Sequence, residues 1–99
     1  MKKYVLYKDG NPVEEPDLIK WATWFEDADR HVADERVGKS QISTVFLGID
    51  HSFEGVEPVL WETMVFGGPL DQECSRCAGS CKDAMAMHAN TVRLVKEAA

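Results

Sequence analysis

The sequence predicts a small α+β domain, in which a three- or four-stranded antiparallel sheet carries two helices packed on one face. Two observations support this. Residues 43–50 and 59–68 are apolar runs rich in β-branched and aromatic residues, separated by a short polar link, which is typical of a β-hairpin. Two segments with helical periodicity flank the hairpin, so the predicted order is β-α-β-β-α. The 99 residues suffice for one domain, residues 1–99.

The first predicted element is a strand over residues 2–8. Tyr4 and Leu6 alternate with Val5 and Tyr7, and a turn follows at residues 9–11, which read Asp-Gly-Asn. Proline lacks a backbone N–H, so Pro12 and Pro16 restrict any returning strand to a sheet edge.

The next predicted element is a helix over residues 17–34. Its apolar stripe consists of Leu18, Trp21, Phe25, Ala28 and Val32, with Trp24 beside it. An acid after a proline suits a helix start at residue 17, and Gly38 is a plausible stop. A face with two tryptophans is typical of a core; the alternative is that one Trp lines a ligand cleft.

The central hairpin has no cleanly polar face. On the first strand, the side chains of Val45 and Leu47 point to one face of the sheet and that of Phe46 points to the other. On the second strand, Glu62 is the one charged residue on its face. The link contains Gly55 and Pro58. Two helices can cover only one side of such a sheet, so the sequence favours a homodimer through the hairpin or a covering loop on the other side.

The last predicted element is a helix that begins after Ser80. Ser80 and Asp83 have the spacing of a capping box. A wide apolar stripe follows, formed by Ala84, Met87, His88, Thr91, Leu94, Val95 and Ala98.

Composition excludes several classes of protein. The net charge is −6 and there is no run of Lys or Arg, which argues against direct binding to nucleic acid. The acidic surface is explained most simply by solubility; the alternative is that it mimics a nucleic acid and occupies a basic protein. No apolar run is long enough to cross a bilayer and the start lacks a signal-peptide core, so a cytoplasmic location is expected. Three cysteines suit a reducing compartment.

Cys74, Cys77 and Cys81 have the spacing C-x2-C-x3-C, with His88 further along. Thiolates and an imidazole can hold zinc, but a single CxxC without a second pair favours reduced, partly buried cysteines. No cofactor is therefore expected.

His51 and Glu62 are the strongest candidates for chemistry. His51 follows Asp50 at the end of one strand, and Glu62 lies in the strand predicted to pair with it. A carboxylate beside an imidazole is the smallest unit of general acid–base catalysis, with His88 as a further candidate. The simpler interpretation places His51 in solvent and pairs Glu62 with a backbone group, Arg30 or Arg36. Candidate partner-binding residues are Trp24, Arg30, Trp61 and Glu62.

The segments WATWFEDADRHVA, STVFLGIDH and PVLWETMVFGG resemble a family of small uncharacterised proteins encoded by phages and prophages. The resemblance covers roughly residues 21–68 and implies source and fold more than activity. The matching residues are Trp21, Trp24, Phe25, Glu26, Arg30, Asp50, His51, Glu62, Thr63, Met64, Gly67 and Gly68. The chain departs from the family at RCAGSCKDA, which has two cysteines and one extra residue at the start of the last helix. A zinc site built from these cysteines would therefore be absent from the other members of the family.

These observations favour a small cytosolic accessory protein that acts by binding. Its expected partner is a host protein, such as a defence component, or a small signalling molecule. One alternative is a small hydrolase that uses His51 and Glu62; another is a structural protein of the phage particle. Convergence of Asp50, His51, Glu62 and His88 in a pocket would favour catalysis or ligand binding, and scatter would favour a protein partner.

Overall fold

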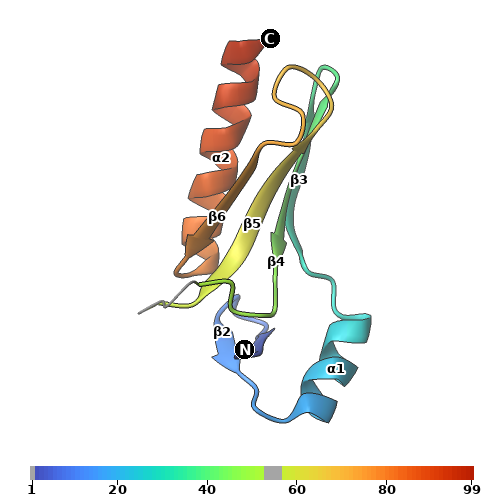
Figure 1. Ribbon diagram of the computed structural model, residues 1–99, viewed down its shortest axis with the longest axis vertical. Helices are drawn as coiled ribbons and strands as arrows, with labels where there is room; N and C mark the ends of the chain where they lie inside the picture. The colour runs from blue at the N-terminus through green and yellow to red at the C-terminus, as the bar shows by residue number, and fades with distance from the viewer. Residues whose placement is uncertain (1, 53–56) are drawn as a thin grey trace.

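The computed structural model describes residues 2–52 and 57–99, and within them the chain forms two helices, a two-stranded sheet and a four-stranded sheet (Figure 1). The predicted α+β class is confirmed. The elements are β1 (Tyr4–Leu6), β2 (Pro12–Glu14), α1 (Leu18–Asp27), β3 (His31–Val37), β4 (Ser40–Phe46), β5 (Val59–Phe66), β6 (Cys74–Ala78) and α2 (Cys81–Ala98).

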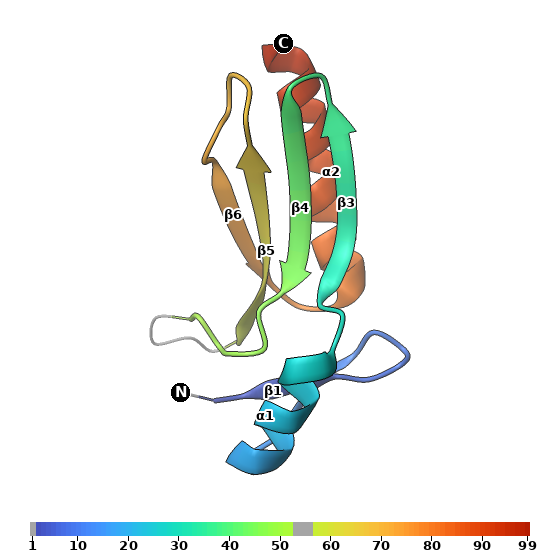
Figure 2. The same cartoon turned by 90° about the vertical axis from the view of Figure 1, so that its right-hand side faces the viewer.

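The larger sheet is an antiparallel meander in the order β3-β4-β5-β6. Helix α2 lies along one face of this sheet and contacts all four strands (Figures 1 and 2). We call this the covered face. Figure 2 looks onto the opposite face, with α2 behind the strands, and we call that the open face.

Burial follows the alternation of the strands. Along β4, every second residue from Ser40 to Phe46 is buried and the residues between are half-buried. Along β5, Trp61, Thr63 and Val65 are buried on the covered face, and Glu62 and Met64 are half-buried on the open face. Strand side chains alternate between faces, so the buried set is the one that α2 covers.

The core consists of two apolar clusters. Near the C-terminal half of α2, Ile42 and Val65 pack against Val92 and Val95. Near its N-terminal half, the buried members of the second cluster are Phe46, Leu60, Trp61 and Ala84. The rings of Phe46 and Trp61 meet edge to face with centroids 5.0 Å apart. Burial of these aromatic and aliphatic side chains supplies the main stabilisation of the domain.

The predicted central hairpin is confirmed as β4 and β5, but its first strand was placed too late: β4 runs from Ser40 to Phe46 and not over residues 43–50. The two strands pair antiparallel, with Thr44 opposite Thr63 and Val45 opposite Glu62. Beyond β4, the loop at Asp50 is bonded back to β5, because the Asp50 carboxylate accepts a hydrogen bond from the Val59 N–H at 2.9 Å. The predicted glycine of the link, Gly55, lies outside the described residues.

The predicted helix over residues 17–34 is too long. Asp17 does cap its start, with its carboxylate accepting from the N–H groups of Ile19 and Lys20. However, α1 ends at Asp27, and residues 31–37 form β3 at the edge of the sheet. Gly38 is not a helix stop, since it turns the β3–β4 hairpin with a positive φ of 58°. A glycine at the first position of a two-residue hairpin turn is favoured for this conformation.

The segment before α2 also differs from the prediction. Residues 74–78 form the edge strand β6, which pairs with β5 and was not predicted. The predicted capping box is confirmed: Asp83 accepts a hydrogen bond from the Ser80 N–H at 2.8 Å.

Helix α1 does not share the covered face with α2. It lies at the far end of the molecule, where it packs on β1 (Figures 1 and 2). The Trp21 indole N–H lies 3.1 Å from the carbonyl oxygens of both Tyr4 and Gly48, which fixes the helix to β1 and to the segment after β4. Gly48 has a φ of 79°, and a Cβ there would come within 3.1 Å of the Phe25 ring. The prediction that both helices pack on one face of the sheet is therefore correct for α2 but wrong for α1.

Within residues 2–52 and 57–99, no helix combines the length and the apolar character needed to span a membrane.

Candidate functional site

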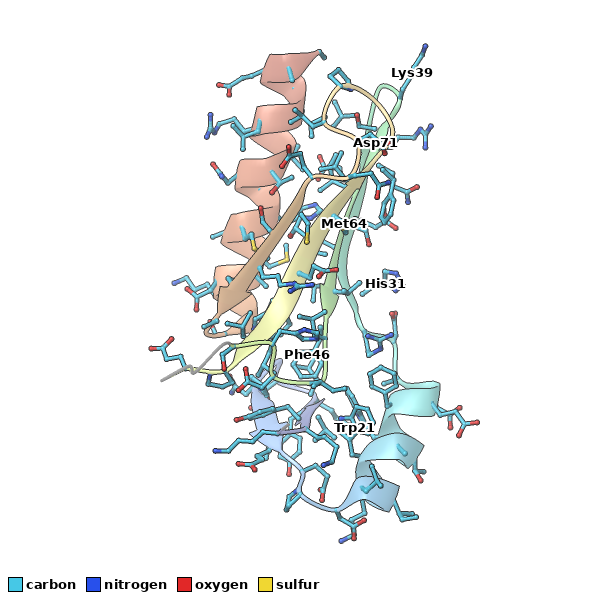
Figure 3. All side chains as sticks on the ribbon, in the orientation of Figure 1. Trp21, His31, Lys39, Phe46, Met64 and Asp71 are labelled. Atoms are coloured by element: carbon cyan, nitrogen blue, oxygen red, sulfur yellow. The ribbon has the colours of Figure 1, made fainter. Side chains whose placement is uncertain are left out.

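The open face mixes apolar and polar side chains. We call Val45, Met64 and Phe66, which lie on β4 and β5, the apolar centre; the polar residues that lie opposite them on the same two strands are Glu62, Ser43 and Gln41. Phe66 is 46% exposed, and Figure 3 shows the sheet nearly edge-on, with His31 directed away from α2. The charged and polar border comes from the edge strands β3 and β6 and consists of His31, Asp34, Arg36 and Arg76. In the described part of the chain, no helix or strand covers this face.

Glu62 lies on the open face and is paired. Its Oε2 accepts a hydrogen bond from Nε of Arg76 at 2.8 Å, across the β5–β6 pair. The sequence had suggested Arg30 or Arg36 as partners, and this was wrong because β6 was not foreseen as a strand. Arg30 instead donates to the Phe46 carbonyl and lies 4.1 Å from the centre of the Phe25 ring.

Asp50 and His51 belong to the loop after β4. The Asp50 carboxylate accepts hydrogen bonds from the N–H and hydroxyl of Ser52 and from the N–H of Val59. Burial would raise the pKa of Asp50, but these hydrogen bonds outweigh it and hold the pKa below its usual value. His51 is exposed, and its backbone N–H donates to the Val59 carbonyl. Asp50 therefore stabilises the loop as an anionic acceptor.

His88 belongs to α2, and its side chain packs on the covered face of the sheet. It is 4% exposed, and its Nδ1 lies 2.7 Å from Oγ1 of Thr44, which also bonds Oγ1 of Thr63. We call Thr44, Thr63 and His88 the polar row; it separates the two apolar clusters. Nε2 of His88 is buried without a hydrogen bond, and the nearest acid, Glu35 Oε1, is 3.5 Å away.

A carboxylate, an imidazole and a hydroxyl in this order form the arrangement that activates a nucleophile. In this protein, however, Thr44 is 0% exposed and Thr63 is 1% exposed, so a substrate cannot reach either hydroxyl. The hydrogen bonds of the polar row therefore satisfy the two threonine hydroxyls and Nδ1 of His88 within the core, but not Nε2 of His88. Sequence reasoning missed Thr44, Thr63 and Glu35. The available signal was a threonine at matching positions of both hairpin strands, on the face that is otherwise apolar.

The cysteines and His88 are not brought together. Cys74 is on the open face, opposite Met64, whereas Cys77 and Cys81 pack beside the Trp61 cluster. Burial, and then the negative charge of Glu62, raise the pKa of Cys74; burial and Asp83 raise that of Cys77. Among the described residues, no group of three or more His, Cys, Asp or Glu could hold a metal ion.

The two candidate tryptophans serve the core. Trp61 is 0% exposed and its indole N–H donates to the Gly79 carbonyl at 2.9 Å. Trp24 is half-buried and meets Phe46 edge to face at 5.9 Å, which joins α1 to the second cluster.

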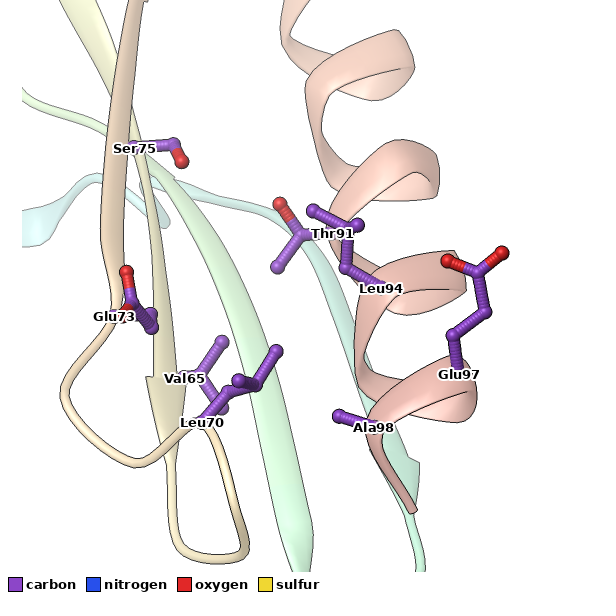
Figure 4. Close-up of a pocket in the computed structure, with 8 residues that line it drawn as sticks. All are labelled: Val65, Leu70, Glu73, Ser75, Thr91, Leu94, Glu97 and Ala98. Carbon is purple, nitrogen blue, oxygen red and sulfur yellow. The ribbon is translucent and has the colours of Figure 1, made fainter.

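A cavity of about 470 Å³ lies between the C-terminal half of α2 and the strands β5 and β6 (Figure 4). Its apolar lining is Val65, Leu70, Leu94 and Ala98, and its polar lining is Glu73, Ser75, Thr91 and Glu97. Leu94 and Ala98 were predicted to be part of the core stripe, but they line this cavity while Val92 takes a core position.

Comparisons of the chain with protein-family models, with curated protein sequences and with solved structures found no match.

Proposed function

We propose that this protein acts by binding another protein through the open face of its sheet. The observation that carries the proposal is the apolar centre of Val45, Met64 and Phe66 within a charged border. A sheet face that meets only water is ordinarily polar, whereas an apolar centre with a polar rim is the usual composition of a protein interface.

The positions of the candidate catalytic residues also support binding over hydrolysis. Glu62 lies on the open face with Arg76, and His88 lies on the covered face with Thr44. His51 is in the exposed loop after β4. Glu62 and His88 lie on opposite faces of the sheet, so these two groups cannot act on the same substrate atom.

The partner follows from the charges and from the resemblance to phage-encoded proteins. The open face carries both signs of charge, since Asp34 is hydrogen-bonded to Gln41 and Glu62 to Arg76, so it suits a partner surface of mixed charge. The proposed partner is a protein of the bacterial host, such as a defence component.

The test uses a charge placed in the apolar centre. Phe66→Asp introduces a carboxylate at a side chain that is 46% exposed, so the fold should tolerate it. Ile19→Asp, on α1, is the matched control because Ile19 is a still more exposed apolar residue at 75%, far from the open face. A host protein retained from lysate by the wild type and by Ile19→Asp, but lost with Phe66→Asp, is the expected result. Equal retention of the host protein by the wild type and both variants would contradict the proposed surface.

The alternative is that the open face binds a second copy of the same chain. Light scattering at high micromolar concentration separates the two. A wild-type dimer that Phe66→Asp converts to a monomer would mean that a second copy, rather than a host protein, occupies the apolar centre.

A further inference from the structure

We propose that the cavity between α2 and β6 binds a small organic cation with an apolar body and a protonated amine at one end. This site is on the covered side of the sheet and is separate from the open face. Its volume of about 470 Å³ lies within the range of small-molecule sites.

The apolar body is inferred from the walls. Leu70, in the connection between β5 and β6, lies beside Val65 of β5, and Leu94 and Ala98 lie opposite them on the last turns of α2 (Figure 4). Leu94 is 43% exposed although it belongs to the apolar stripe of its helix. A ligand that covers Leu94 therefore removes apolar surface from water, which favours binding.

The positive charge is inferred from the polar lining. Both charged residues that line the cavity are acids, Glu73 and Glu97, and none of its described lining residues is basic. Glu97 is already neutralised by Arg93, whose Nη1 lies 2.9 Å from its Oε2. Glu73 is exposed at the end of the cavity nearest β6, so its carboxylate is the group that attracts a cation.

An amine with N–H donors is inferred from the hydroxyl groups. The Thr91 hydroxyl donates its proton to the Met87 carbonyl at 3.0 Å, so towards a ligand it can act only as an acceptor. With the Glu73 carboxylate, this gives two groups that can only accept; the Ser75 hydroxyl, which also lines the cavity, can accept or donate. A primary ammonium matches them, while a carboxylate would be repelled and a quaternary ammonium has no proton to donate.

The test titrates the full chain, whose mass of 11.1 kDa suits amide NMR, with matched eight-carbon probes at low salt. Octylammonium should shift the amide signals around Thr91, Leu94 and Glu73, with a Kd of about 1 mM or lower. Octanoate and octyltrimethylammonium should bind at least about fivefold more weakly. Butylammonium, which has the same charge but a shorter body, should also bind at least about fivefold more weakly.

Two variants locate the site. Leu94→Ser should weaken octylammonium binding about fivefold, whereas Met85→Ser, a change at an α2 residue of similar exposure (44%) outside the cavity, should not. Glu73→Lys should weaken octylammonium about fivefold and strengthen octanoate, whereas Glu26→Lys, the same change of charge on α1, should do neither.

Four results would overturn the proposal. The first is octanoate or butylammonium binding as tightly as octylammonium. The second is an affinity for octylammonium that Glu73→Lys leaves unchanged. The third is the absence of shifts around Leu94 up to 10-fold above the expected Kd. The fourth is a shift, on dilution of the protein without any probe, of the amide signals of residues that line the cavity. A second copy of the chain would then occupy the cavity.

Discussion

On the covered face of the sheet, Ile42, Thr44 and Phe46 of β4 are completely buried, whereas Ser43 and Val45, which lie between them, are half-buried on the open face. The same alternation holds on β5, where buried Trp61 and Thr63 enclose half-buried Glu62. Neighbouring residues of one strand thus differ in burial. Those under α2 contribute to the stability of the core, and those on the open face are available for the proposed binding. Substitutions at adjacent positions provide matched tests of this division.

The largest expected effect is at Phe46. Phe46→Ala removes a fully buried ring that contacts Trp24 and Trp61, and should lower the free energy of unfolding by about 3–5 kcal/mol. Val45→Ala, one residue earlier and on the open face, should cost about 1 kcal/mol or less. Urea denaturation of both variants measures the difference. Equal losses at the two positions would mean that the faces do not differ in burial as described.

The polar row should give the next largest effect. Thr44→Val keeps the shape of the side chain but leaves Thr63 and His88 without their hydrogen-bond partner, so it should cost about 1–3 kcal/mol. Ser43→Val, the adjacent change on the open face, should be neutral or slightly stabilising, because valine suits a strand. Replacing all three polar residues by apolar ones of similar shape should recover much of the loss, since no unpaired group remains. Thermal unfolding of the variants checks this.

Sequence alone was sufficient where local pattern and final environment agree. The alternation in β4 and β5, the Asp17 cap and the capping box of Ser80 and Asp83 are all local signals, and all were predicted. The edge strands β3 and β6 were missed for a physical reason. Segments such as Ala33–Asp34–Glu35–Arg36 favour helix on their own, and they become strands only through pairing with β4.

The errors at the candidate site follow from those missed strands. Without β6 the partner of Glu62 could not be identified, and without β3 there was no reason to place Glu35 near His88. The cavity could not be predicted either, because it depends on how α2 sits against β5 and β6. The position of α1 at the end of the sheet is set by contacts of Trp21 with Tyr4 and Gly48, residues far from it in sequence.

The two candidate carboxylates should also differ, and Asp50 should have the larger effect on stability. Asp50→Asn keeps one acceptor oxygen but loses the charge that three hydrogen bonds stabilise, and should cost about 1–2 kcal/mol at pH 7. The pKa of Asp50 is lowered in the folded state, so its contribution is fully present above the unfolded pKa, near 3.8, and is lost as the pH falls through the lower folded value. The stabilities of wild type and variant should therefore converge as the pH falls below the unfolded pKa of Asp50 and through its lower folded value. A constant gap between them down to pH 2 would contradict this role.

Glu62→Gln should have the smallest effect on stability. Its partner Arg76 has a side chain that is 48% exposed, and ion pairs in contact with solvent contribute only about 0.2–1 kcal/mol, so the loss should be at most about 1 kcal/mol. Glu97→Gln, which breaks the exposed pair with Arg93 on α2, is the control for the loss of a surface ion pair. The two variants should unfold within a few tenths of a kcal/mol of each other, but only Glu62→Gln should weaken capture of the partner protein, because only Glu62 lies beside the apolar centre of the open face. A loss of about 3 kcal/mol for Glu62→Gln would instead assign this carboxylate to the stability of the sheet, and the division between the two faces would then fail at the residue where it matters most for binding.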